Sequence, residues 1–270
     1  SFSTLIPEMR KLRDWVLEAE CRYVAMESTG IYWQPIYEML EPCFDGQISI
    51  LVVNARHMKN VPGRKTDMRD AQWIATLLRA GLLKGSFIPD KTFRELRHLT
   101  RYRKSIVRDI TAQKNRIDKF LQSSGFRFTA FLSDAFGASG RNIIRHLMEY
   151  GNISREALDR CLKTQTRKRI DEILIALNGS LSEHQRGFLR MIFGHLEALE
   201  QHRHTVEDAI TKEITKHEEA LSLLCSIPGI DVTAAAAIIA EIGTDMSAFP
   251  DSQHICSWAG LSPGNNESAG

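Results

Sequence analysis

The most constraining feature of this sequence is a pair of long apolar stripes at helical spacing between residues 89 and 217. Steps of three, four and seven residues bring apolar side chains to one face of a helix, as in long helices that pack as a coiled coil. The first stripe consists of Phe93, Leu96, Leu99, Ile106, Ile110, Ile117 and Leu121. The second consists of Leu189, Ile192, Leu196, Leu199, Val206, Ile210 and Ile214. Arg203 interrupts the second stripe, so we expect this seam to be short or to be assembled with a partner chain.

Shorter elements are predicted on either side of the second stripe. Glycines scattered from Gly125 to Gly179 indicate short helices and turns. Beyond residue 217, an apolar run ending in Pro228 and Gly229 precedes an alanine-rich helix, Thr233–Ile242. This is the outline of a helix-hairpin-helix, whose turn directs backbone N–H groups at a phosphate. A simple helical hairpin in a core has the same outline, so both interpretations stand.

Residues 1–88 show a different pattern, in which helical and strand segments alternate. The expected elements are helices over 5–17 and 31–40, strands over 23–26 and 48–53, and a helix capped by Thr66 that stops at Gly81. The run 48–53 is continuously apolar, which is typical of a buried parallel strand. Short links between strands and helices favour an α/β layer.

Length and composition are those of an ordinary globular protein, with 270 residues, 43% hydrophobic and 25% charged. No apolar run is long enough to span a membrane. The five cysteines are scattered and odd in number, so we expect reduced thiols in a cytosolic protein. The histidines have no cysteine nearby, which argues against a zinc site. Ser1 and Gly270 are expected to be boundaries of a fragment or of an ordered region.

Positive charge is concentrated in one segment, although the formal net charge is only +2. Between Lys91 and Lys119 there are ten Lys or Arg and three Asp or Glu. Such a stripe is either a phosphate-contacting surface or a solvated helix face, and charge alone does not decide between them. The residues that we single out for phosphate contact are Arg97, Arg101, Arg103, Lys104, Arg108, Lys114 and Arg116.

Three carboxylates form the candidate for chemistry. Asp67 and Asp70 are three residues apart, on one face of a predicted helix near its start. Their charges repel unless a cation lies between them, and Mg²⁺ prefers such oxygen ligands. The helix dipole also favours acids in a first turn, so this pair alone is not diagnostic. Glu27 follows a predicted strand, where a carboxylate faces the ligand crevice of an α/β sheet or is simply exposed.

Together, Glu27, Asp67 and Asp70 are predicted to converge on one edge of the sheet. Metal ions held by carboxylates from different elements drive in-line phosphodiester chemistry. The stretch between them is basic and is suited to hold a nucleic-acid backbone, or else it is a solvated loop. Its basic residues are Arg56, His57, Lys59, Arg64 and Lys65.

A resemblance to a known family is carried by five segments that occur in this order: VAMESTGIYW, VVNARHMKNVPGRKTDMRDAQWIATLLRAGLL, RELRHLTRYRKSIVRDITAQKNRI, SIPGI and AGLSPGNNESAG. They resemble the DEDD transposases of the one-ten class of insertion sequences. These transposases are relatives of the Piv DNA invertases and are described as bridge-RNA-guided recombinases. The resemblance spans nearly the whole chain.

This resemblance implies a RuvC-like, RNase H-type domain with four acidic residues that bind Mg²⁺ or Mn²⁺. The second acid matches Glu27, and the last two match Asp67 and Asp70. The first belongs on a strand expected before Ser1, so the domain is expected to lack its first strands. Asp14 is no substitute, because it lies in a predicted amphipathic helix.

The resemblance also implies a serine nucleophile in a short Ser-Gly-like motif after a Gly-Leu-x-Pro stretch. That stretch is 260–263 here, and the motif is Ser268-Ala269-Gly270, with one alanine inserted. Ser268 is therefore the implied nucleophile, and Ser262 is the alternative. The serine would attack a DNA phosphate and form a phosphoserine link that conserves the bond energy for rejoining.

We therefore predict a DNA recombinase of a mobile element with a RuvC-like α/β domain (1–88), a helical coiled-coil region (89–217) and a helical C-terminal domain (218–270). By resemblance its partners are double-stranded DNA, a noncoding bridge RNA and further copies of the chain in a dimer or tetramer. The expected location is the bacterial cytoplasm, at the nucleoid. One alternative is a RuvC-like nuclease that forms no covalent intermediate, and another is a noncatalytic nucleic-acid-binding scaffold.

Overall fold

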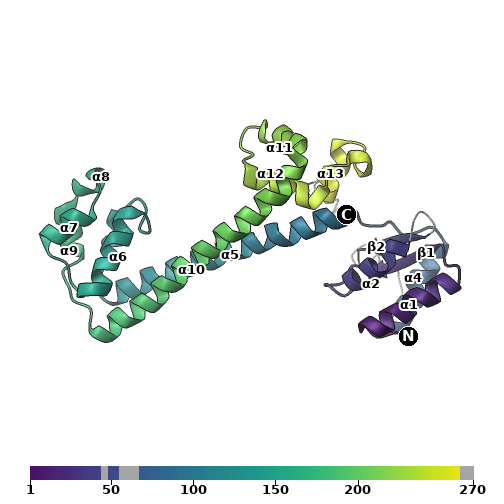
Figure 1. Cartoon of the computed structure of the whole chain (residues 1–270), viewed down its shortest axis with the longest axis horizontal. Helices are drawn as coiled ribbons and strands as arrows, with labels where there is room; N and C mark the ends of the chain where they lie inside the picture. The colour runs from purple at the N-terminus through teal and green to yellow at the C-terminus, as the bar shows by residue number, and fades with distance from the viewer. Residues whose placement is uncertain (44–47, 55–66, 262–270) are drawn as a thin grey trace, which may run out of the picture. The chain divides into compact units, whose positions relative to one another are not determined.

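The computed structural model describes residues 1–43, 48–54 and 67–261, with the backbone alone for 67–70 (Figure 1). The described chain is mostly helical and contains one small parallel sheet. By packing it forms two compact units, Ser1–Pro89 with Ser247–Gly270, and Asp90–Met246. The three predicted domains stay a prediction, because a packing unit and a functional domain need not coincide.

The first unit is built on a two-stranded parallel sheet. Its elements are α1 (Ile6–Glu18), β1 (Tyr23–Glu27), α2 (Trp33–Leu40), η1 (Glu41–Cys43), β2 (Ser49–Val53), α4 (Asp67–Arg79) and α13 (Ser252–Trp258). The sheet register pairs Tyr23 with Ser49 at one end and Glu27 with Val53 at the other. Beyond α4, the N–H of Ser86 donates to the Val52 carbonyl at 2.7 Å, so the chain returns alongside β2.

The sequence pattern explains these elements. The apolar residues of β2 include Val52 and Val53, each 1% exposed, as expected for a strand buried in a parallel sheet. Both predicted strands, their parallel pairing and the helices at 5–17 and 31–40 are confirmed. Helix α4 ends just before Gly81, whose φ of +70° suits glycine and stops the helix. Thr66, the predicted cap of α4, lies outside the described residues.

The second unit is built on two long helices. Its elements are α5 (Lys91–Ser123), η2 (Phe128–Phe131), α6 (Ala138–Tyr150), α7 (Arg155–Cys161), α8 (Thr164–Arg167), α9 (Ile170–Ala176), α10 (Glu183–Ile214), η3 (Thr215–His217), α11 (Glu218–Cys225) and α12 (Val232–Ile242), and η4 (Met246–Ala248) follows. Helices α5 and α10 lie side by side and run antiparallel (Figure 1). Helices α6–α9 lie at one end of this pair, and α11 and α12 lie near the other.

The predicted apolar stripes form the seam between α5 and α10. Every stripe residue is buried except Leu99 and Leu199, which are partly buried against the same core. Arg203 does not end the seam, because Val206 and Ile210 beyond it are buried within the same chain. The expectation of a short seam was therefore wrong. Supercoiling of the two helices stays a prediction.

One amide is buried in this seam. Gln113 is 1% exposed, and its Nε2 donates to the Ile192 carbonyl of α10 at 2.6 Å. Sliding one helix along the other would leave this amide buried without its partner, which costs about 1–3 kcal/mol. Gln113 therefore favours one register of α5 on α10.

The hairpin of α11 and α12 packs on α5. Alanines Ala235, Ala236 and Ala240 of α12 are buried there together with Ile239. Their small side chains allow the helices to approach closely. The predicted pair of helices joined by a Pro-Gly turn is confirmed, and its alanine-rich helix is part of the core. Phosphate contact by the turn stays a prediction.

All five cysteines are free. Across the described ranges, no helix is both long enough and apolar enough to cross a membrane.

Two glycines test the packing of the second unit in opposite directions. A Cβ at Gly140, at the start of α6, would overlap the carbonyl oxygen of Ala135. Gly140→Ala is expected to lower the free energy of unfolding by about 1–3 kcal/mol, as overpacking does. A Cβ at Gly194, inside α10, would meet nothing within 4 Å. Gly194→Ala is expected to raise the free energy of unfolding by about 0.5–1 kcal/mol, because alanine favours a helix. Urea denaturation of both variants measures the two effects, and equal effects would contradict this packing.

Candidate functional site

Glu27 lies at the carboxyl end of β1. It is the last paired residue of the strand, opposite Val53, and the N–H of Ser28 continues the ladder to the Val53 carbonyl at 2.9 Å. The carboxylate is half-buried and accepts a hydrogen bond from the Thr29 hydroxyl. A fixed, half-buried carboxylate at this edge has the placement expected of a ligand or catalytic group.

Asp67 and Asp70 lie in the first turn of α4. Helix α4 packs against β1, the strand that ends in Glu27. Residues three apart in a helix share one face, so the backbone puts both aspartates on one face of α4. The positions of their side chains, and hence their distances to Glu27, lie outside the description.

The donor set suits a hard divalent cation, since all three groups are carboxylates. Among the described residues, no three His, Cys, Asp or Glu side chains come together as metal ligands. That set does not include the side chains of Asp67 and Asp70. The metal site therefore stays a prediction, and Glu27 is the one member whose surroundings are described.

Several predicted site residues fall outside the described ranges. They are the serines Ser262 and Ser268 and the basic residues Arg56, His57, Lys59, Arg64 and Lys65.

The basic residues at the start of α5 are engaged by α12. Arg97, whose side chain is 15% exposed, donates Nη2 to the Glu241 carbonyl at 2.8 Å and Nε to the Ala240 carbonyl at 3.3 Å. Arg101 forms a two-point contact with the Glu241 carboxylate, at 2.8 and 3.0 Å. Burial lowers the pKa of Arg97, and the adjacent Glu241 partly offsets this effect. These arginines bind the last turn of α12, whose carbonyls carry partial negative charge.

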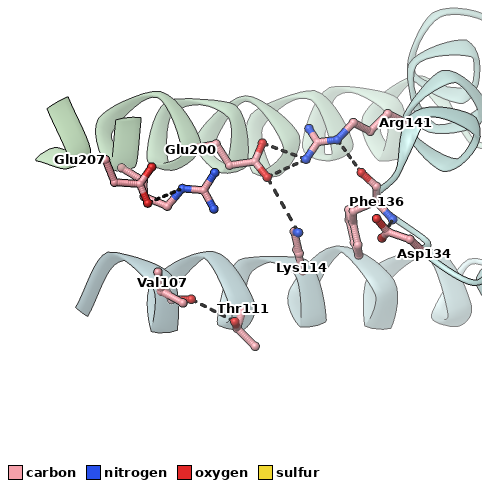
Figure 2. A network of polar contacts seen from close by, with 9 residues as sticks. Val107, Thr111, Lys114, Asp134, Phe136, Arg141, Glu200 and Glu207 are labelled. Carbon is pink, nitrogen blue, oxygen red and sulfur yellow. Dashed lines mark hydrogen bonds and ion pairs between the residues drawn. The ribbon is translucent and has the colours of Figure 1, made fainter. Parts of the chain in front are cut away.

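Further along α5, basic residues are engaged by α10. Arg103 pairs with Glu207 at 2.7 Å. In Figure 2, Lys114 reaches from α5 toward Glu200, at 3.9 Å, and Arg141 of α6 contacts the same carboxylate at 2.6 Å. Arg116 donates to the side chain of Gln113. These glutamates are far from α5 in sequence, so the charge pattern of α5 did not reveal them.

Three of the seven predicted phosphate contacts, Lys104, Arg108 and Arg116, are exposed and form no ion pair within the described chain, although Arg116 donates to Gln113. Lys104 lines a groove of about 650 Å³ between α5, α10 and the first turn of α12. Thr233 and Asp231 also line the groove. The Asp231 carboxylate accepts a hydrogen bond from the Ala234 N–H at 2.7 Å. The basic stripe and the predicted phosphate-binding hairpin therefore meet at this groove.

Comparisons with known proteins identify the family. A family model for the DEDD transposase of IS110, described as a transposase, matches residues 1–125. A model described as the transposase IS116/IS110/IS902 family matches residues 221–270. The chain belongs to this family of transposases, and the resemblance found in the sequence is confirmed.

A relative is the "Insertion element IS110 uncharacterized 43.6 kDa protein" of Streptomyces coelicolor. It is 28% identical over 222 residues, which is 75% of this chain and 53% of the relative. The chain therefore spans about half the length of this relative. Residues 126–220, which include α6–α9, lie between the two family matches.

The contacts of α5 divide its basic residues into two sets. We predict that the residues without an ion pair contact DNA, and that the residues paired with glutamates stabilise the fold. Replacing two of the unpaired residues, Lys104→Gln with Arg108→Gln, is expected to weaken DNA binding. It should lower the slope of log affinity against log salt by about 2, since each phosphate contact contributes about 0.9. The stability of the fold should not change. Fluorescence anisotropy with duplex DNA at several salt concentrations measures the slope.

Arg103→Gln serves as the matched comparison. It breaks the ion pair with Glu207 and is expected to lower the free energy of unfolding by about 1 kcal/mol, with little change in the salt slope. A larger loss of slope in Arg103→Gln than in the double variant would contradict this division.

Proposed function

We propose that the protein to which this chain belongs is an active transposase, which cuts and rejoins DNA strands to move an insertion sequence. The observation that carries the proposal is the placement of Glu27. It ends a parallel strand against which α4 packs, and α4 begins with the two aspartates of the predicted site. Membership of a transposase family supports the same reading.

The proposed acidic centre belongs to a RuvC-like domain. Glu27, Asp67 and Asp70 would hold Mg²⁺ or Mn²⁺, together with a fourth acid that is not among these residues. When bound, the metal would stabilise the negative charge that develops on the scissile phosphate. Glu27 is held by the Thr29 hydroxyl and by the end of the sheet ladder, so it would offer a fixed oxygen ligand.

The proposed nucleophile is the hydroxyl of Ser268. Its oxygen would bond to a DNA phosphorus as the bond from phosphorus to one strand breaks, and its proton would pass to the departing strand oxygen. The hydroxyl of a second strand would then attack the phosphoserine and release the serine. The support for Ser268 is the resemblance of residues 260–270 to the C-terminal motif of the family.

The proposed partners are duplex DNA and a structured noncoding RNA that pairs with it. Base pairing would then select the sequence, while the protein contacts the backbone. Lys104, Arg108 and the groove beside α12 would contact phosphates. Copies of the chain would associate as a dimer or tetramer through the coiled-coil region, in the bacterial cytoplasm at the nucleoid.

The acidic centre is tested in the full-length protein with Asp67→Asn and Glu27→Gln. Each is expected to reduce strand cleavage more than about a hundredfold, since losing several kcal/mol of charge stabilisation costs a factor of ten per 1.4 kcal/mol. Asp109→Asn, an exposed acid of α5, is the control and should cleave normally. Unchanged transposition by Asp67→Asn would instead favour the noncatalytic scaffold.

The nucleophile is tested with Ser268→Ala on labelled DNA. We expect loss of the covalent protein–DNA adduct, detected as labelled protein in a denaturing gel, because alanine has no hydroxyl to attack phosphorus. Ser262→Ala is the control and should keep the adduct. Continued cutting by Ser268→Ala at the normal rate would identify a nuclease that uses water as the nucleophile.

A further inference from the structure

A groove between α6 and α7 lies in the part of the chain between the two family matches. Its volume is about 660 Å³. Its walls carry aromatic, amide and charged side chains, which include Asn142, His146, Glu149, Tyr150, Asn152 and Arg160. No predicted site residue lies in it.

Two rings of α6 form an aromatic wall of this groove. The His146 and Tyr150 rings are 4.6 Å apart between centroids and tilted by 40°. Tyr150 is 58% exposed, so a face of this aromatic pair is open to solvent. Burial lowers the pKa of His146, which favours the neutral ring near neutral pH. An exposed neutral aromatic pair is a surface on which a flat heterocycle stacks.

Polar groups beside the rings match the edge of a nucleobase. The Asn142 side chain donates Nδ2 to the Cys161 carbonyl at 3.3 Å, and both residues line the groove. Asn152 is exposed, and its amide carries both donors and an acceptor. The Glu149 carboxylate accepts a hydrogen bond from the Tyr150 side chain, which raises the pKa of Tyr150, and its charge repels phosphate. A base is therefore favoured inside the groove and its phosphates outside.

The chain that leaves the groove is strongly basic. Residues 160–169 contain five Lys or Arg and no Asp or Glu. Within the described chain, Arg160, Lys163 and Lys168 are exposed and form no ion pair, whereas Arg167 pairs with Asp159. Arg169 pairs with Glu172.

The backbone of Lys163 is held against α6, because its N–H donates to the Ser139 hydroxyl at 3.0 Å. Arg160 lines the groove and Lys163 lies two residues beyond its Cys161 wall, and neither cation forms an ion pair within the described chain.

We propose that the groove between α6 and α7 binds single-stranded RNA, with one unpaired base stacked on Tyr150 and the flanking phosphates on Arg160 and Lys163. Bases of duplex DNA are already stacked and paired, whereas RNA loops present bases that are free to stack on protein rings. This inference rests on the RNA partner of the proposed function and gives that RNA a binding site on the protein.

The test measures binding without catalysis, in the presence of a metal chelator. The probe is a fluorescein-labelled single-stranded RNA of about 16 nucleotides, the upper size for one such surface. Tyr150→Ala is expected to weaken affinity by about 5- to 100-fold, as loss of one base–aromatic stack does. Tyr150→Phe keeps the ring and should stay within about twofold of the parent protein. The side chain is exposed, so the fold should withstand both changes, and circular dichroism checks this.

A charge variant tests the phosphate contacts. Arg160→Gln with Lys163→Gln is expected to lower the salt slope by about 1.4, or about 0.7 for each contact to a single strand. Lys212→Gln removes an exposed cation of α10 outside the groove and should leave the slope unchanged. Ultraviolet cross-linking of the RNA should map to Tyr150 or His146.

Each remaining outcome has a defined meaning. Equal affinities for Tyr150→Ala and Tyr150→Phe would overturn the inference while the proposed RNA partner stands. If Tyr150→Ala weakened binding to single-stranded DNA of the same sequence as much as it weakened binding to RNA, the choice of RNA would be overturned. If the parent protein bound no RNA, both the guided part of the proposed function and this inference would fail. The covalent adduct on DNA decides the catalytic proposal separately.

Discussion

The packing of α5 against α10 is the interaction on which the second unit depends. Each of the twelve buried side chains of the two stripes contributes up to about 1.5–3 kcal/mol, whereas an ion pair at the surface contributes about 0–1 kcal/mol. The apolar seam therefore sets the arrangement, and the charged residues adapt to it. Helices α6–α9 and the α11–α12 hairpin are then carried on this pair of helices.

This arrangement determines which basic residues on α5 are available to bind phosphates. Antiparallel packing brings Glu200 and Glu207 of α10 beside Lys114 and Arg103, and α12 brings Glu241 beside Arg97 and Arg101. Charges paired in this way are less available to phosphates than unpaired ones. Unpaired cations of the described chain include Lys104, Arg108 and Arg116 on α5, and Arg160, Lys163 and Lys168 on the segment 160–169. A count of positive charges along a helix therefore overestimates its capacity to bind nucleic acid.

The first unit is organised around its sheet and not around a pair of long helices. There, a short parallel sheet places Glu27 at its carboxyl edge and supports α4, whose first turn contains Asp67 and Asp70. An active site assembled from separate strands and helices needs such a sheet, because the sheet holds residues distant in sequence at one edge. In the proposed recombinase, the chemistry belongs to this unit and the RNA groove belongs to the other.

The sequence by itself determined the elements whose signal is local. Apolar periodicity predicted both long helices and their buried faces, and a continuous apolar run predicted the parallel strand β2, because side-chain burial follows the repeat of the backbone. The five segments that resemble the DEDD transposases also identified the family. Only the tertiary structure decided which charges are neutralised, that the seam continues past Arg203, and that His146, Tyr150 and Arg160 line one groove. These facts depend on contacts between residues far apart in the chain, and no local repeat encodes them.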